Sequence, residues 1–171
     1  MYHLPYIQTI NENKIIFGLG NIHFRFSHIS IVQYLSAINI NYLIGIKGIL
    51  IPSASLMIFI FMYFIKQCHD IKKVNDFTIK DFFDFSILIY ISYKINRYSG
   101  FGNDAIAHLL FFYLISQFLK VSENYENLYK TSLISIFIFL NKITLIFSFF
   151  FPLFLFLKNK EKKLKILFSF P

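Results

Sequence analysis

The chain has 171 residues and a net charge of +8, and 56% of its residues are hydrophobic whereas only 15% are charged. This balance excludes a soluble globular domain, and the few proline and glycine residues exclude a disordered, linker-like or collagen-like chain. The single cysteine, Cys68, excludes an internal disulfide. The composition therefore predicts an integral membrane protein, which we treat as one transmembrane domain over residues 1–171.

The first segment in chain order, residues 1–45, is expected to combine an outer-face loop with one juxtamembrane helix. The chain begins with Met1-Tyr2-His3-Leu4-Pro5, which has neither the basic start nor the apolar run of a signal peptide. Within residues 26–40, polar side chains recur about every third residue, at Ser27, Ser30, Gln33 and Ser36. This stripe predicts an amphipathic helix that lies in the membrane interface and does not cross the bilayer.

Five membrane crossings are predicted within residues 46–157, at about 46–65, 79–95, 104–119, 128–141 and 143–157. The run 49–65 carries no charge, so it inserts into a bilayer most readily. The second crossing requires a helix that begins near Thr78. Thr78 and Asp81 have the spacing of a capping box, and Asp84 lies near the positive end of the same helix. The third crossing is short and requires some local thinning of the bilayer.

The last two crossings share one apolar block, residues 131–157, which is too long for a single comfortable crossing. Asn141 and Lys142 lie inside this block, and a lysine at the bilayer centre costs roughly 2.5 to 3.5 kcal/mol. We therefore predict two short helices that meet at Asn141-Lys142, with the lysine at an interface. Residues 158–171 are expected to form a cytoplasmic Lys-rich segment and the start of a truncated crossing.

The positive charges assign the two sides of this arrangement. Eleven lysines fall on one side, namely 66, 72, 73, 80, 120, 130, 158, 160, 162, 163 and 165, against six cations on the other. The richer side is cytoplasmic by the positive-inside rule, so residues 1–45, 96–103 and the 141–142 turn share the outer face. The charge thus sets orientation, and no nucleic-acid partner is expected. The expected location is a bacterial inner membrane, with the lipid bilayer as partner.

The polar residues that could carry chemistry collect on this predicted outer face. Asp104 and His108 are four residues apart, so they share one face of the helix that begins there. Arg97 and Lys142 are cations near the ends of crossings, where they could pair with a phosphate. The alternatives are that Asp104 caps its helix, that His108 bonds a neighbouring helix, and that both cations only reach lipid headgroups.

Other residue types do not form recognisable sites. His3, His23 and His28 have no metal-ligand spacing, so no metal site is expected. Gly18-Leu19-Gly20 lacks the third glycine of a dinucleotide fingerprint and is interpreted as a loop turn. Cys68 could be acylated, but an ordinary thiol is the favoured interpretation.

The order of these motifs resembles the multispanning glycosyltransferases of the GT-C class, which include dolichyl-phosphate mannose-protein mannosyltransferase-like and aminoarabinose transferase-like enzymes. Residues 2–6 resemble the Tyr/His/Pro-rich stretch of that class, and residues 103–108 resemble an outer loop in which an Asp opens a new crossing. Residues 140–144, with the later Pro152, resemble its turn between two short crossings. The resemblance covers most of the chain.

The resemblance implies transfer of a sugar from a polyprenyl-phosphate-linked donor at the outer membrane face. It implies that His3, Asp104 and His108 bind substrate and that Arg97 and Lys142 bind the donor phosphate, and it identifies no cofactor. The acidic catalytic residue of the class would precede Met1, so we expect an internal piece of such an enzyme that is inactive alone. The alternative is a non-catalytic membrane module, such as a small transporter or an assembly subunit.

Overall fold

The computed structural model describes residues 3–13, 30–71, 77–98, 104–120 and 125–168. Within these ranges every regular element is a helix, so the all-α prediction is confirmed. In chain order the elements are α1 (His3–Asn13), α3 (Ile31–Ile38), the 3-10 helix η2 (Gly45–Leu50), α4 (Ile51–Ile71), α5 (Ile79–Tyr98), α6 (Asp104–Lys120), α7 (Tyr125–Asn141), the 3-10 helix η3 (Ile143–Phe149) and α8 (Phe150–Phe168).

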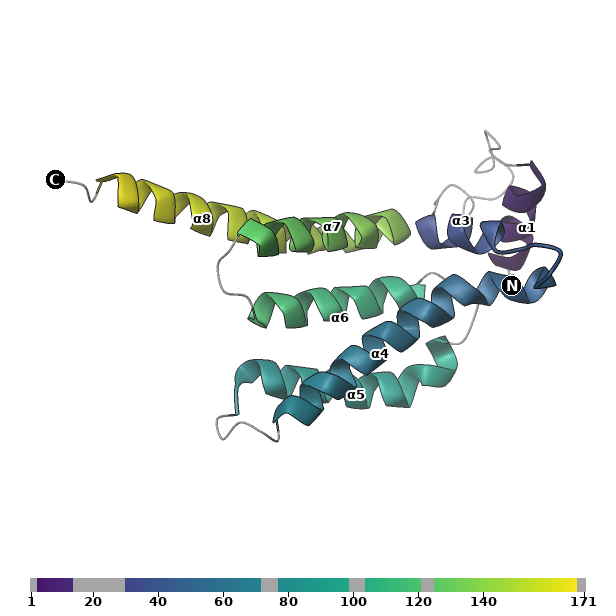
Figure 1. The fold of residues 1–171 in the computed structure, drawn as a ribbon, viewed down its shortest axis with the longest axis horizontal. Coiled ribbons are helices and arrows are strands. Elements are labelled where there is room, and N and C mark those ends of the chain that lie inside the picture. Colours follow the sequence, from purple (N-terminus) through teal and green to yellow (C-terminus); the bar gives the residue numbers. More distant parts are fainter. Residues whose placement is uncertain (1–2, 14–29, 72–76, 99–103, 121–124, 169–171) are drawn as a thin grey trace.

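The longer helices run back and forth between the two ends of the molecule (Figure 1). α1, α3, the start of α6 and the end of α7 lie at one end, which we call the α3 end. The end of α6 and the start of α7 lie at the opposite end, and α8 extends beyond it. The outer-face segments predicted from the charge distribution therefore meet at one end wherever the structure describes them.

The most apolar stretch combines η2 with α4. Residues Gly45–Asp70 form 26 helical residues that contain an 18-residue window with a mean hydropathy of 2.2, so this stretch is long and apolar enough to cross a membrane. Among the described residues it is the one helix that meets both criteria, and Ile143–Asn159 is a shorter apolar helix. The clearest crossing predicted from the sequence thus coincides with the clearest candidate in the structure.

A tight turn connects α3 to this stretch. The Asn41 side chain accepts hydrogen bonds from the backbone N–H groups of Leu43 and Ile44, at 3.1 and 3.0 Å. Gly45 has a φ of +62°, a left-handed conformation that glycine adopts without strain. A Cβ atom at Gly48 would lie 2.0 Å from the carbonyl oxygen of Asn39, so only glycine permits this close approach.

The predicted capping box starts α5. The Thr78 backbone N–H and hydroxyl donate to Asp81 Oδ2 at 2.9 and 2.6 Å, and the Asp81 N–H donates to Thr78 Oγ1 at 3.3 Å. These bonds satisfy backbone and hydroxyl groups that would otherwise lack partners at a helix start. The helix prediction for residues 79–95 is therefore confirmed.

The predicted break at Asn141-Lys142 is also confirmed. α7 ends at Asn141, Lys142 adopts an extended conformation, and the chain folds back as η3 and α8 against α7. Buried serines line the contact: Ser135 Oγ donates to the Ser148 carbonyl oxygen at 2.9 Å, and Ser148 Oγ donates to the Ser135 carbonyl oxygen at 3.3 Å. Small polar residues of this kind allow two helices to approach closely. α8 continues through the Lys-rich segment to Phe168, where the sequence had predicted an end near residue 157.

The main core lies between α4, α5, α6 and α7. Its most enclosed side chains include Phe64, Ile106, Leu114 and Ile138, each at most 1% exposed. Large apolar side chains also point outward, as at Phe59, Ile89, Phe147 and Phe154 of four different helices, each more than half exposed. Water-soluble monomers rarely expose so much apolar surface on adjacent helices. These outward faces suit a surrounding of lipid or of other apolar protein.

The N-terminal part differs from the sequence prediction, because residues 3–13 form helix α1 where a loop was expected. Pro5 is compatible with this helix because it occupies the first turn, where its missing N–H costs least. Tyr6 and Ile7 pack with Ala37 of α3 and Ile49 of η2 in a second, smaller core. Burial, and the neighbouring Tyr34, raise the pKa of the Tyr6 hydroxyl.

The polar stripe of α3 faces inward, toward the neighbouring helices. Ser30, Gln33 and Ser36 are each at most 5% exposed, whereas Ile38 is 74% exposed. The physical reason is that α3 packs on α1, α4 and α7, so its polar side bonds to other helices. Ser27 lies outside the described residues.

Candidate functional site

Three of the five candidate residues meet at the α3 end of the molecule. The Nζ atom of Lys142 lies 3.1 Å from Asp104 Oδ1 and 3.4 Å from His108 Nε2. Asp104 begins α6 and His108 follows one turn later, while Lys142 comes from the break between α7 and η3. We call Asp104, His108 and Lys142 the α6–α7 cluster.

The backbone around Asn141 positions Lys142 for this contact. Asn141 is fully buried, and its side-chain oxygen accepts hydrogen bonds from Ser30 Oγ at 2.9 Å and from the Val32 N–H at 3.1 Å. Its side-chain nitrogen donates to the Phe137 carbonyl oxygen at 2.8 Å. Asn141 thus fastens the end of α7 to the start of α3. Lys142 follows in an extended conformation, which directs its side chain to α6.

The cluster is partly open to its surroundings. The Asp104 side chain is 63% exposed and the Lys142 side chain 23% exposed. An ion pair with this exposure contributes little to stability, typically about 0 to 1 kcal/mol, so a competing anion can separate it. Because an ammonium group can only donate, its contact with His108 requires an unprotonated Nε2 and a neutral ring.

The first turn of α6 adds to the positive character of this site. The first N–H groups of a helix have no intrahelical acceptor and carry a partial positive charge. Asp104 and Lys142 lie beside this helix start, so an anion held there would meet both the ammonium group and backbone donors. The arrangement can bind an anion and place a carboxylate and an imidazole next to it.

The other two candidates cannot be joined to the cluster. His3 begins α1 and Arg97 lies in the last turn of α5, but their side chains are outside the described part of the structure. The Gly18–Gly20 stretch, His23, His28 and residues 99–103 are also outside the described ranges.

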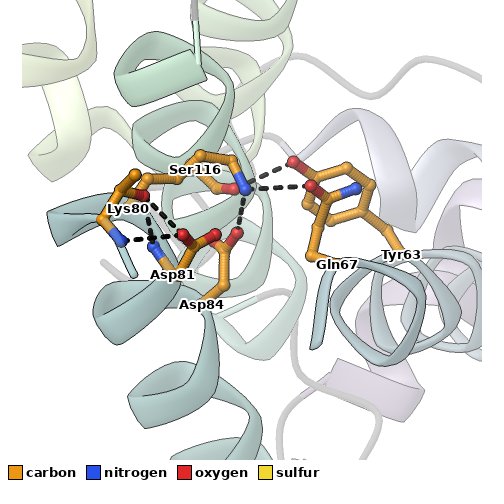
Figure 2. A network of polar contacts seen from close by, with 7 residues as sticks. Tyr63, Gln67, Lys80, Asp81, Asp84 and Ser116 are labelled. Carbon is orange, nitrogen blue, oxygen red and sulfur yellow. Dashed lines mark hydrogen bonds and ion pairs between the residues drawn. The ribbon is translucent and has the colours of Figure 1, made fainter. Parts of the chain in front are cut away.

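A second polar cluster, which the sequence analysis missed, lies between α4, α5 and α6 near the start of α5 (Figure 2). Lys80 forms an ion pair with Asp84 and donates to the Gln67 side-chain oxygen at 2.9 Å. Nearby, Tyr63 of α4 and Ser116 of α6 are joined through their hydroxyl groups at 2.9 Å. The cluster therefore links three helices through polar bonds inside an apolar core.

Asp84 and Ser116 are the most enclosed members of this second cluster, each 0% exposed. The Asp84 carboxylate contacts Lys80 through Oδ2, whereas its buried Oδ1 atom has no hydrogen-bond partner among the described residues. The sequence analysis had placed Asp84 only near a positive helix end. The spacing of Lys80 and Asp84, four residues apart, is the signal that could have identified the pair. Their partners on α4 and α6 have no such local signal.

The described side chains do not form a metal centre. No group of three or more His, Cys, Asp or Glu residues is close enough to hold a metal ion in the parts of the chain that the structure describes.

A model for a domain of unknown function, DUF8201, matches residues 1–170 of the chain. No curated protein and no solved structure matches it.

Proposed function

The chain belongs to the DUF8201 family, and for this member we propose a membrane protein of the GT-C glycosyltransferase-like type that binds a polyprenyl-phosphate-linked sugar. The α6–α7 cluster is the proposed binding site for the phosphate. The observation that carries the proposal is the convergence of Asp104, His108 and Lys142, which come from two parts of the sequence, at one end of the helices.

The chemistry of the cluster suits a phosphate monoester or diester. Lys142 supplies a charge-assisted hydrogen bond, and the first N–H groups of α6, which have no intrahelical acceptor, supply further donors. The exposed Asp104 carboxylate gives up its contact with Lys142 when phosphate enters, and it then accepts a hydrogen bond from a sugar hydroxyl. Neutral His108, one turn later in α6, helps to position the same sugar hydroxyl.

The proposal includes five crossings of a bacterial inner membrane, at α4, α5, α6, α7 and η3 with α8. It is supported by the apolar side chains that point outward from several of these helices and by their antiparallel course (Figure 1). The excess of lysine at the opposite end supports a location of the α3 end outside the cell under the positive-inside rule. A lipid-linked donor would then reach the cluster from the outer leaflet.

The alternative function is a non-catalytic membrane module, such as a small transporter or an assembly subunit. It is favoured by the Asn141 bonds to α3 and by the fully buried Asp84, because polar groups of this kind also hold helices together in membranes. In that case the α6–α7 cluster would only join α6 to α7.

Lipid binding by the purified full chain in detergent tests the proposal. Polyprenyl phosphate should bind more tightly than the uncharged polyprenol of the same length, and Lys142→Gln should weaken phosphate binding about tenfold without changing polyprenol binding. Lys94→Gln is the matched control. Lys94 is also a lysine near a helix end, but its ammonium group lies over the Tyr93 ring of α5 and does not belong to the α6–α7 cluster. Equal binding of the two lipids, or an equal effect of the two variants, would favour the non-catalytic module.

A further inference from the structure

A groove between α6 and α7 opens at the end opposite the α6–α7 cluster. It encloses about 230 Å³ and is lined by Tyr113 and Gln117 of α6 and by Asn127, Lys130 and Ile134 of α7, among others. A dry cavity of about 150 Å³ already admits benzene, whereas sites for drug-sized ligands begin at about 300 Å³. The groove therefore fits a headgroup-sized ligand.

The lining combines hydrogen-bond donors with an apolar wall. Lys130 brings an ammonium group, Gln117 and Asn127 bring amides, and Tyr113 brings a hydroxyl. Among the described residues that line the groove there is no acidic side chain, and Leu133 and Ile134 supply the apolar side. Such a lining favours a ligand with an anionic head and an alkyl chain.

Two members of the lining are prepared for such a ligand. The Tyr113 ring packs edge-on against Tyr63, with 4.7 Å between ring centroids, which fixes its orientation. Gln117 is half-buried and makes no hydrogen bond within the described part of the chain, so its amide can bond a ligand without losing a protein partner. The amide N–H groups of Gln117 can donate hydrogen bonds to a ligand that carries several acceptor oxygens.

We propose that this groove binds the headgroup of an anionic glycerophospholipid from the membrane leaflet at that end. The leaflet is set by position along α6. The α6–α7 cluster uses Asp104 at the first position of the helix, whereas Gln117 of the groove lies 13 residues later, about 20 Å along the helix axis. One headgroup cannot occupy both sites. The groove also lies at the lysine-rich end, which attracts the anionic lipids of a cytoplasmic leaflet.

This inference needs the membrane insertion of the proposed function but does not need phosphate binding at Lys142. The two claims fail separately, because Lys130 lies in the second turn of α7 whereas Lys142 follows the last residue of this helix. A Lys130→Gln variant should therefore retain the wild-type preference of the α6–α7 cluster for polyprenyl phosphate.

Native mass spectrometry of the full chain in detergent tests the groove. Phosphatidylglycerol and phosphatidylcholine with identical acyl chains are the probes, and millimolar inorganic phosphate is the competitor. Phosphatidylglycerol should be retained about tenfold more than phosphatidylcholine, and Lys130→Gln should remove that preference. Lys120→Gln is the matched control, because Lys120 is exposed at the end of α6 and outside the lining; its effect should stay within about twofold.

Three results would overturn the assignment. Equal retention of the two phospholipids would show that the groove does not select an anionic headgroup. Equal effects of Lys130→Gln and Lys120→Gln would show attraction by the lysine-rich end as a whole. Displacement of phosphatidylglycerol by inorganic phosphate would identify a site for a free anion instead of a lipid. Circular dichroism of both variants verifies that they remain folded.

Discussion

Lys142 and Asp104 join α7 to α6 through a contact of 3.1 Å, although each stands at a helix boundary. Lys142 occupies the break after α7, and Asp104 begins α6. Both residues were singled out from the sequence for separate reasons, one as an interfacial cation and one as the start of a crossing. Their contact brings an ammonium group and a carboxylate to one accessible position.

Asp104→Asn should strengthen the binding of polyprenyl phosphate. In the wild type, the Asp104 carboxylate competes with the phosphate for Lys142, and the amide removes that competing charge. We expect the dissociation constant for polyprenyl phosphate to fall several-fold, because the phosphate no longer has to break an exposed ion pair that contributes about 0.2 to 1 kcal/mol. The measurement is lipid binding in detergent at fixed ionic strength.

The matched control for this variant is Asp70→Asn, because Asp70 is an exposed acid near the end of α4, next to His69. It should leave polyprenyl phosphate binding unchanged. Weaker binding in Asp104→Asn would contradict the competition and would show that the carboxylate itself is needed to hold the lipid phosphate site together.

Asn141→Ala should destabilise the fold strongly. The substitution leaves the Ser30 hydroxyl and the Val32 N–H buried without their acceptor and removes the link between α3 and α7. We expect a loss of about 2 to 4 kcal/mol from the free energy of unfolding. Thermal unfolding in detergent measures it. Asn39→Ala is the control, because among the described residues the Asn39 side chain bonds only the exposed Leu35 carbonyl oxygen. Equal melting temperatures for the two variants would refute the role of Asn141.

Lys80→Met should destabilise the protein more than the double substitution Lys80→Met/Asp84→Leu. The single change leaves the fully buried Asp84 carboxylate without its counter-charge, which costs about 3 to 5 kcal/mol. Replacing both charges by apolar groups restores most of that loss. Thermal unfolding of the two single variants and the double variant measures the coupling between them. Additive losses would mean that the pair is not coupled in the folded protein.

The local features of this fold could be predicted from the sequence. Two of them depend only on residues that are close in sequence. These are the capping box of Thr78 and Asp81, and the polar Asn141-Lys142 pair within an apolar block. The helix over residues 3–13 has no such signal, because it has no long apolar run and contains Pro5. This helix packs against α3, and the sequence of residues 3–13 alone does not predict that contact.

The candidate site could be predicted in part for the same reason. Asp104 and His108 share a helix face by spacing alone, but the approach of Lys142 depends on how α6 and α7 pack. The second cluster shows the limit most clearly, since Tyr63, Gln67 and Ser116 look like ordinary members of apolar helices. Only the packed structure brings them to Lys80 and Asp84.

The orientation of the chain can be measured by cysteine labelling in intact cells. On a Cys68→Ser background, Tyr42→Cys should react with a membrane-impermeant maleimide, because Tyr42 is fully exposed near the α3 end. Lys158→Cys, in α8, should react only after the membrane is permeabilised. The reverse pattern would overturn the positive-inside assignment. Labelling of both residues in intact cells would place them on the same side of the membrane and would contradict five crossings between them.

Photo-crosslinking tests the central claim most directly, namely that the α6–α7 cluster holds the phosphate of a lipid-linked donor. A polyprenyl phosphate with a photoreactive group next to the phosphate is irradiated with the full chain, and the modified peptides are mapped by mass spectrometry. We predict modification within residues 104–108 and 142–145, competed by unlabelled polyprenyl phosphate and reduced in Lys142→Gln. Modification confined to the lysine-rich end, or insensitive to competition, would contradict the account.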